Sequence, residues 1–409
     1  MFIIPIEKLK TYSLLSVALL ISSGPIIAAN IPEIAQDFPD KSLTQVELLT
    51  TIPSLFVILG VLIGNRLELW IGKKSTILMG LGFFFIAGIF PVIMHEVFSL
   101  VFISRCLFGL GIGLFNRLII QMISEIYQNN PGKQASLIGL ESAFEGLGGI
   151  CLTLLVGQLL KINWYTSFYV YALALPILVA FFFFVPADTR EMEKRNTEQL
   201  TTTSDNSRDK RPLQVMAGFG ILLFVIVIIF INYNIQITPL ILEKNIGNAT
   251  NGSNMLAFIG LGAFTAGFSF GKIYKLVRNY IVPLAILLLG VSMCVTTISQ
   301  SILLTTFCSM VIGFSFRCIM PYLLHTFTQQ ISRMAKLGTT IVLVAYNLGA
   351  TLSPYEGTLI RRLFHVQSVQ SVVFTNAIIL LMMAITGFGV AYVYQKRRVV
   401  KEFNTTDFI

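Results

Sequence analysis

Two carboxylates, Glu141 and Glu145, have the greatest capacity for chemistry in this sequence, and they lie in the stretch GLESAFEGLGGICLTLLVG at residues 139–157. They stand one helical turn apart in a hydrophobic segment, about 40° apart on a helical face that they share with Gly148. Carboxylates inside a membrane are costly and usually face a bundle interior or a wet cavity. Burial favours the protonated carboxyl and a nearby arginine favours the ionised one, so such a residue can take up and release protons.

We predict that Glu145 is the preferred proton-coupling candidate, because it lies about 4–5 Å from the predicted midplane, where transporter sites concentrate. Glu141, about 10 Å from the midplane, is the second candidate. Arg117 of the preceding apolar segment lies between them in depth. An alternative therefore stays open, in which Arg117 and the glutamates form a fixed buried pair that only orders the helices.

Two further arginines stand inside apolar segments. Arg105 shares a helical face with Gly109 and Asn116, so we expect it to line a central cavity. Arg317 is costly without a partner in the middle of its segment and is another site candidate. Polar amides complete the predicted substrate site, with helix–helix hydrogen bonding or interfacial placement as the alternatives: Asn30, Asn116, Asn232, Asn234, Gln236 and Asn347.

The elements that must position these residues are membrane spans. The 409-residue chain is 55% hydrophobic and only 12% charged, with a mean hydropathy of +0.78. In soluble domains, about a quarter of all residues are charged. The five cysteines all lie in apolar segments, with no spacing typical of a metal site or a disulfide, so neither a metal nor a cofactor is expected.

Segments of about 20 mainly apolar residues, enough to cross a bilayer, recur twelve times. A charged stretch rich in Ser and Thr, 188–212, divides them into two sets of six and reads as a flexible linker. We therefore expect an N-terminal six-helix bundle at 1–187 and a C-terminal bundle with a tail at 213–409. The predicted spans are 12–32, 43–64, 75–94, 98–126, 136–160, 165–186, 213–235, 254–271, 280–299, 302–327, 338–360 and 371–395.

Orientation follows from Lys and Arg in the predicted loops. Most of these residues fall on the side of the two termini and the linker, which predicts that this side is cytoplasmic. The net charge of +9 is then explained by topology, and no nucleic-acid partner is expected. A shift of 200 residues also superposes Gly149 and Gly157 on Gly349 and Gly357, which fits the internal repeats of secondary transporters. The basic residues on the other side are Lys41, Lys161, Lys244, Arg361 and Arg362.

Three local motifs carry a family resemblance. The loop GNRLELWIGKKSTILMG holds Gly64, Glu68, Gly72, Lys73 and Lys74, although its acid stands four residues before Gly72 and not three. The stretch RCLFGLGIG in the fourth span provides a second motif with its arginine and glycines. The fifth span matches the antiporter motif only in part. With twelve spans in two halves, the chain resembles the major facilitator superfamily, and within it the bacterial drug:proton antiporters.

The resemblance implies an all-α membrane protein of twelve transmembrane helices in two pseudo-symmetric bundles, in the cell membrane of a bacterium. It also implies that the loop of Lys73 and Lys74 gates the cytoplasmic side. We expect a monomer that exports small hydrophobic or amphipathic compounds in exchange for protons and contacts membrane lipids. The alternatives are a proton symporter or facilitator that imports a nutrient, and a transport-inactive sensor. No intramembrane nucleophile and base are paired, so an enzyme is not expected.

Overall fold

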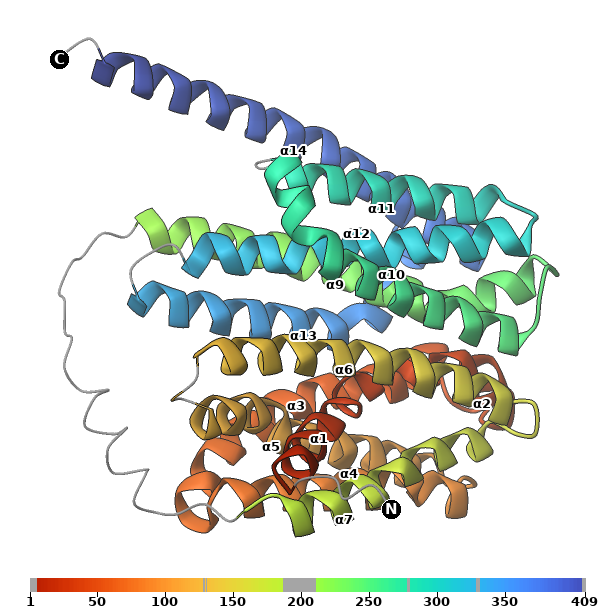
Figure 1. The fold of residues 1–409 in the computed structure, drawn as a ribbon. Helices are drawn as coiled ribbons and strands as arrows, with labels where there is room; N and C mark the ends of the chain where they lie inside the picture. Colours follow the sequence, from red (N-terminus) through yellow and green to blue (C-terminus); the bar gives the residue numbers. More distant parts are fainter. Residues whose placement is uncertain are drawn as a thin grey trace.

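The computed structural model describes residues 6–127, 129, 131–186, 211–277, 280–328 and 332–406. The predicted linker lies outside the described residues apart from its last two positions. The described chain folds into helices and contains no strand, as the sequence predicts (Figure 1). Figure 1 shows the helices running side by side in two groups, one below the other.

The N-terminal half holds the six predicted spans, of which the first and the sixth are built from more than one piece. The first span contains two 3-10 segments between α-helices, and the sixth begins as a 3-10 helix. The elements are α1 Ile6–Ala18, η1 Ile21–Ser23, η2 Pro25–Asn30, α2 Ile31–Asp37, α3 Leu43–Ile71, α4 Lys73–Ile93, α5 Phe98–Ile126, α6 Pro131–Leu159, η3 Tyr165–Leu173 and α7 Ala174–Phe184.

The C-terminal half holds the other six. Its first helix continues eight residues past the predicted end of the seventh span, so the amide-rich stretch around Asn234 lies inside the helix and not at its outer end. The elements are α9 Arg211–Glu243, α10 Ala249–Val277, α11 Ile281–Ile298, α12 Ile302–Thr328, α13 Ser332–Leu363 and α14 Val369–Thr406.

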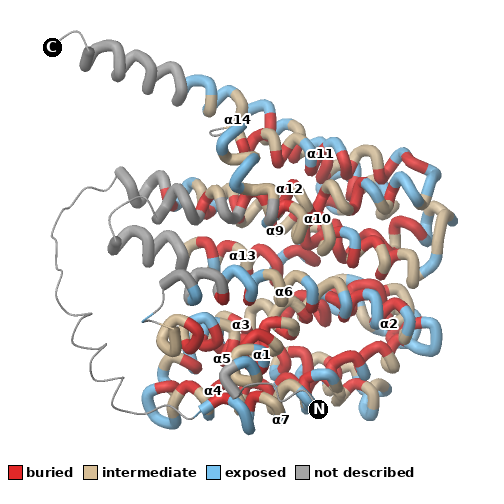
Figure 2. Tube along the Cα trace, viewed as in Figure 1, coloured by how far each residue is buried: buried red, intermediate tan, exposed pale blue. Residues whose placement is uncertain are grey.

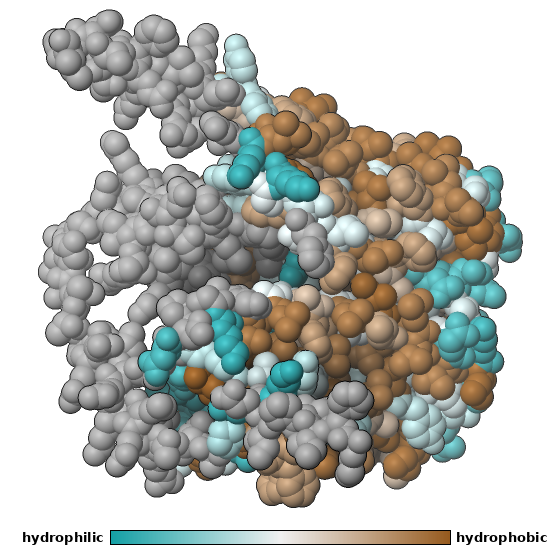
Figure 3. All heavy atoms as spheres, viewed as in Figure 1, coloured by the Kyte–Doolittle hydropathy of each residue, from teal (hydrophilic) through white to brown (hydrophobic). Residues whose placement is uncertain are grey.

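Most of these helices can cross a membrane. Within the described residues, 10 are long and apolar enough, and Ala249–Gly267 with Ser269–Val277, bent by 64°, makes an eleventh span. The helix outside this set is α13, whose described part carries Asn347, Thr351 and Glu356 among its apolar residues. Figure 3 shows hydrophobic residues covering much of the visible outer surface, as expected of a surface that faces lipid.

The first span breaks where Gly24 precedes Pro25. Proline has no backbone N–H and disturbs a helix that would run through it, so the chain changes to 3-10 geometry on either side. A break in a membrane helix is tolerated only where the freed backbone groups find other partners. The break therefore brings polar backbone groups to the interior of the N-terminal half.

Close glycine contacts pack each half in the same way. A Cβ at Gly113 of α5 would overlap the Val57 carbonyl oxygen of α3, and a Cβ at Gly313 of α12 would overlap the Ile259 carbonyl oxygen of α10. Such contacts let two helix backbones approach closely. The two glycines are 200 residues apart, the same shift that relates the predicted fifth and eleventh spans, so the internal repeat is expressed in the packing.

Two pairs of helices make the largest contacts between the two halves. These pairs are α3 with α13 and α6 with α10. Four hydrogen bonds between described residues join the halves, and all four lie toward the end where α3 begins, which we call the Ser42 end. The opposite end, where α4 begins and the linker leaves, is called the linker end. Figure 2 shows buried residues running through both halves and along the faces where they meet.

Candidate functional site

The predicted pair of glutamates lies where α6 passes the break in the first span. Gly148 is so close to Leu19 that any Cβ would overlap the Leu19 backbone. This approach places Glu145 beside η1, and the Ser22 hydroxyl donates to its Oε1 at 2.6 Å. Glu141 is buried, and its Oε2 accepts a 3.4 Å hydrogen bond from Ser142. The broken helix thus supplies the polar partner of Glu145.

The C-terminal half brings a positive charge to the same place. Arg317 of α12 is an electrostatic neighbour of Glu141, which also has Glu145 beside it. Tyr346 of α13 has both Arg317 and Glu145 as electrostatic neighbours. We call Ser22, Glu141, Glu145, Arg317 and Tyr346 the central cluster. It joins a pair of carboxylates from one half to a guanidinium from the other.

Aromatic rings lie on the C-terminal side of the central cluster. Phe316, next to Arg317, stacks on Phe230 of α9 with ring centroids 3.8 Å apart, and Tyr346 lies 6.4 Å from Phe316. Aromatic faces and a guanidinium together suit flat or amphipathic groups. The C-terminal side of the central cluster therefore offers aromatic surface.

The alternative in which Arg117 pairs with the glutamates is wrong. The Arg117 Nη2 lies 3.4 Å from Glu68 Oε1 and 3.2 Å from Gln121 Oε1. Its side chain is 48% exposed. Depth alone placed Arg117 between the two glutamates, but the rotation of α5 turns its side chain toward α3.

Arg105 does not line a cavity, contrary to the prediction, because it is completely buried inside the N-terminal half. Its Nε donates to Leu49 O at 3.0 Å, its Nη2 to Gly24 O at 2.8 Å and its Nη1 to Tyr171 OH at 3.3 Å. Its guanidinium carbon also lies 4.3 Å from the ring centroid of Phe108. The break in the first span explains this position, since it frees the Gly24 carbonyl to accept.

The loop between α3 and α4 has the tight turn that the motif indicates. Gly72 has a φ of 82°, a left-handed conformation that favours glycine, and it ends one helix and begins the next. The Lys73 Nζ pairs with Glu125 Oε1 of α5 at 2.6 Å. The Lys74 Nζ donates to Phe182 O of α7 at 2.8 Å. These contacts tie the loop to helices of its own half, whereas Gly64, one of the motif residues, is buried in α3.

The predicted amides do not form one site. Asn30 donates to Trp164 O at 3.1 Å and to Ser167, so it fixes the first span to the start of the sixth. Asn347 donates to Leu343 O of its own helix at 3.0 Å. Asn116 is half-buried on α5. For Asn30 and Asn347, helix–helix or intrahelical bonding is what the structure shows.

The amides of α9 lead to a second polar cluster that sequence reasoning missed. Gln236 Nε2 donates to Glu47 Oε1 of α3 at 2.8 Å. Asn376 Nδ2 of α14 lies 3.4 Å from Glu356 Oε2 of α13. Arg361 is an electrostatic neighbour of both carboxylates. We call Glu47, Gln236, Glu356, Arg361 and Asn376 the α3–α13 cluster. Its signal was present in the sequence as two lone glutamates inside predicted spans 43–64 and 338–360.

Two other amides of α9 flank this cluster. Asn232 Nδ2 donates to Ser353 O of α13 at 3.1 Å, and Asn234 is buried with no hydrogen-bond partner for its Oδ1. Asn232 thus faces α13 and Gln236 faces α3, so these two amides do not share one cavity.

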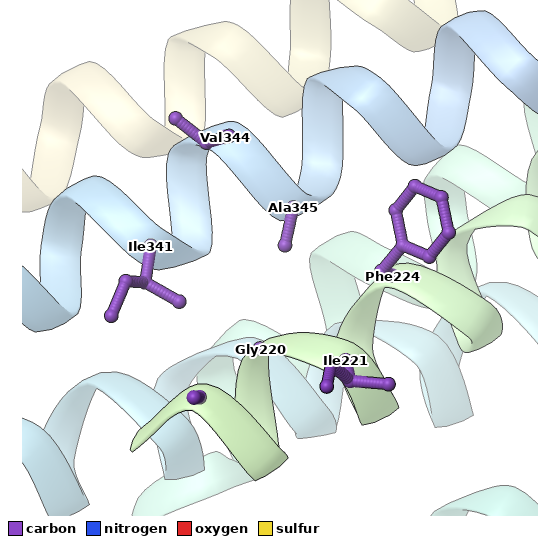
Figure 4. Close-up of a pocket in the computed structure, with 7 residues that line it drawn as sticks. Gly220, Ile221, Phe224, Ile341, Val344 and Ala345 are labelled. Atoms are coloured by element: carbon purple, nitrogen blue, oxygen red, sulfur yellow. The ribbon is translucent and has the colours of Figure 1, made fainter. Parts of the chain in front are cut away.

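An apolar pocket of about 370 Å³ opens between α9 and α13 toward the linker end. Figure 4 shows labelled lining residues on both helices. It can accommodate a small hydrophobic group. The lining residues are Ala217, Gly220, Ile221, Phe224, Ile341, Val344 and Ala345.

These observations define a polytopic membrane protein with a transporter fold. They are the broken first span, the pairs of helices that join the two halves, and the charges that meet between the halves. The Major Facilitator Superfamily profile matches residues 13–354, and the chain belongs to this family. No curated protein sequence matches the chain significantly.

Solved structures share the fold at low identity. A D-xylose-proton symporter is 12% identical with a TM-score of 0.67, over 92% of this chain and 96% of the other. The peptide transporter POT in complex with sulfate is 15% identical with a TM-score of 0.67, over 94% of each chain. These likenesses support the two-bundle fold.

Proposed function

We propose that this protein is a proton-coupled exporter of small hydrophobic or amphipathic compounds that works by alternating access. The observation that carries the proposal is the central cluster, in which Glu141 of one half, with Glu145 beside it, is an electrostatic neighbour of Arg317 of the other. When the halves move apart at this level, the carboxylates lose the guanidinium as a neighbour, and their affinity for protons changes. Proton binding is thereby linked to the relative position of the halves.

Alternating access requires closure at one end at a time. The four hydrogen bonds between the halves at the Ser42 end support a state that is closed there. The distribution of Lys and Arg supports a cytoplasmic linker end, with both termini on that side. In this state the central cluster is reached from the cytoplasm, where an exporter collects its substrate.

The substrate class follows from the walls. The apolar pocket between α9 and α13 and the stacked rings of Phe230 and Phe316 offer apolar and aromatic surface with few polar groups. Such walls favour hydrophobic or amphipathic compounds over sugars or other strongly hydrated solutes, which need many hydrogen bonds. We propose a monomer, because one chain supplies both halves of the site.

A second candidate is proton-coupled import. The observation in its favour is that the D-xylose-proton symporter and the peptide transporter POT have the same fold as this chain. The central cluster serves either direction, because coupling depends on when the carboxylates are protonated and not on the sign of substrate flux.

The test is transport by the purified protein in liposomes, with a pH-sensitive dye inside and ethidium or a panel of neutral amphipathic dyes as substrates. We expect substrate flux driven by a proton gradient, in exchange for protons. Glu145→Gln, which cannot ionise, should lose gradient-driven flux and keep passive exchange. The control is Glu96→Gln, a carboxylate in the exposed loop before α5, which should transport normally.

Co-transport of dye and protons in the same direction would favour the importer. Absence of any flux with a folded protein would leave a sensor. Normal gradient-driven transport by both Glu145→Gln and Glu141→Gln would refute the central cluster as the coupling site.

A further inference from the structure

The α3–α13 cluster lies between the two halves, away from the central cluster. Glu47 comes from α3 of the N-terminal half, while the other four members come from α9, α13 and α14. Thr44, one turn before Glu47, shares a 2.7 Å hydrogen bond with Thr358, two residues after Glu356. Glu47 is 1% exposed, and Gln236 is fully buried. The cluster is therefore assembled only where α3 and α13 are in contact.

Close packing holds the members together. A Cβ at Gly357 would lie 2.8 Å from Asn232 Nδ2 and 3.6 Å from Gln236 Nε2. Gly357 follows Glu356 directly, so the backbone beside Glu356 lies against the amide that donates to Glu47. The two carboxylates thus belong to one connected polar region.

Some polar atoms of this region have no hydrogen-bond partner, and these atoms indicate the protonation state of the carboxyl groups. Each carboxyl group is paired with a carboxamide that donates its N–H, Gln236 to Glu47 and Asn376 to Glu356. The oxygens of both amides, Gln236 Oε1 and Asn376 Oδ1, are buried without a hydrogen-bond partner. An ionised carboxylate has no proton to donate to them, whereas a protonated carboxyl has one O–H. A carboxyl–carboxamide pair is complete only when the carboxyl carries a proton.

The charges of the cluster point the same way. Glu47 and Glu356 are electrostatic neighbours of each other, and Arg361 is the cation beside both. Two carboxylates and one guanidinium leave one negative charge in a buried place, which is costly. One bound proton makes the cluster neutral. It also removes the repulsion between a carboxylate of one half and a carboxylate of the other.

Titratable groups on the other elements packed against α3, α13 and α14 have other surroundings. Arg105 of α5 donates to Leu49 O, Gly24 O and Tyr171 OH. On α2, Glu33 has Asp37 as its electrostatic neighbour, and Asp37 accepts from Trp164 Nε1 at 2.6 Å. On α12, Arg317 belongs to the central cluster, and α11 contributes the thiol of Cys294.

We propose that the α3–α13 cluster is a proton-binding site that links uptake of one proton to closure of the Ser42 end. A proton from water binds one carboxylate oxygen of Glu47 or Glu356 as α3 and α13 come together, and it leaves when they separate. This site is distinct from the central cluster. Its protonation sets which end of the molecule is closed, whatever substrate is carried.

The test measures the closure directly. Spin labels at Asp40→Cys and Leu363→Cys, exposed positions on the two halves at the Ser42 end, report the distance between the halves in lipid nanodiscs. The five natural cysteines are first replaced by serine or alanine. Between about pH 5 and about pH 9, we expect the ratio of closed to open populations to fall at least tenfold, which is the change produced when the closed state binds the proton at least tenfold more tightly than the open state.

Three variants and one control test whether the residues of the α3–α13 cluster carry the pH response. Glu356→Gln and Glu47→Gln each leave one carboxylate opposite Arg361, so the ratio should change less than about twofold over the same range. Arg361→Gln removes the cation and should move the transition to higher pH. The control, Glu96→Gln in the exposed loop before α5, should keep the transition of the parent protein. Thermal unfolding of each variant checks that it is folded.

The proposal is overturned by a distance that does not respond to pH in the parent, or by a response that survives in both glutamine variants. A response lost in Glu141→Gln would assign the effect to the central cluster instead. Sodium replaced by choline at constant pH should change nothing, and a shift there would make this a metal-cation site. Failure of gradient-driven dye flux with the pH response intact would refute the proposed exporter and leave this site standing.

Discussion

The Arg105 Nη2 donates a 2.8 Å hydrogen bond to the carbonyl oxygen of Gly24, at the break of the first span. The same guanidinium reaches Leu49 O of α3 and Tyr171 OH of η3. One buried side chain thereby connects four of the six spans of the N-terminal half. Its motif position suggested a cavity residue, but the contacts are those of a structural centre.

Arg105→Leu should therefore destabilise the protein as well as affect transport. It removes the donors to Gly24 O and Leu49 O, and each buried acceptor left without a partner costs about 1–3 kcal/mol. Thermal unfolding in detergent measures the loss. Arg66→Leu, an exposed arginine on α3, is the matched control and should unfold like the parent. Equal melting of both variants would contradict a structural role for Arg105.

The ion pair between Arg117 and Glu68 should contribute little to stability. Its atoms are 3.4 Å apart, and the arginine side chain is about half exposed, so solvent screens the pair. A double-mutant cycle with Arg117→Gln and Glu68→Gln should give a coupling of at most about 1 kcal/mol. Arg117→Gln should also leave proton-coupled flux unchanged. Loss of coupling in this variant would restore Arg117 as a partner of Glu145.

The two lysines of the α3–α4 loop should contribute differently to the stability of the protein. Lys73 is buried and lies 2.6 Å from Glu125, whereas Lys74 is half-buried. We expect Lys73→Met to lower the melting temperature by more than Lys74→Met, because removing Lys73 leaves the Glu125 carboxylate without this cation. Spin-label distances across the linker end then show whether either lysine also gates that side. The larger melting effect in Lys74→Met would contradict the expectation.

Close helix packing makes a sharp test at glycine. Gly313→Ala places a methyl group onto the Ile259 carbonyl oxygen, so we expect a destabilisation of about 1–3 kcal/mol. Gly113→Ala should behave alike against Val57. Gly82→Ala on α4 is the control, since no atom lies within 4 Å of its Cβ position, and alanine there should stabilise the helix by about 0.5–1 kcal/mol. Equal unfolding of all three variants would refute close packing of α10 on α12.

The sequence predicted several features of the site because their causes are local. The turn at Gly72 needs a left-handed residue, and the spacing of the following lysines marks it. Glu141 and Glu145 were found because a carboxylate in an apolar helix is conspicuous. The partners Ser22 and Tyr346 could not be predicted, since a serine and a tyrosine carry no such signal in their own segments.

By itself, the sequence determined that the chain is a polytopic membrane protein of this family, because hydropathy and loop motifs depend on short stretches of chain. Only the tertiary structure decided which charges meet. Arg117 pairs with Glu68, and Arg105 donates to the carbonyl of Gly24 at the break in the first span. Glu47 lies in one cluster with Glu356. The physical reason is that a few tens of degrees of helix rotation, or one break in a helix, redirects a side chain to another neighbour. Helix packing across the whole molecule sets those rotations.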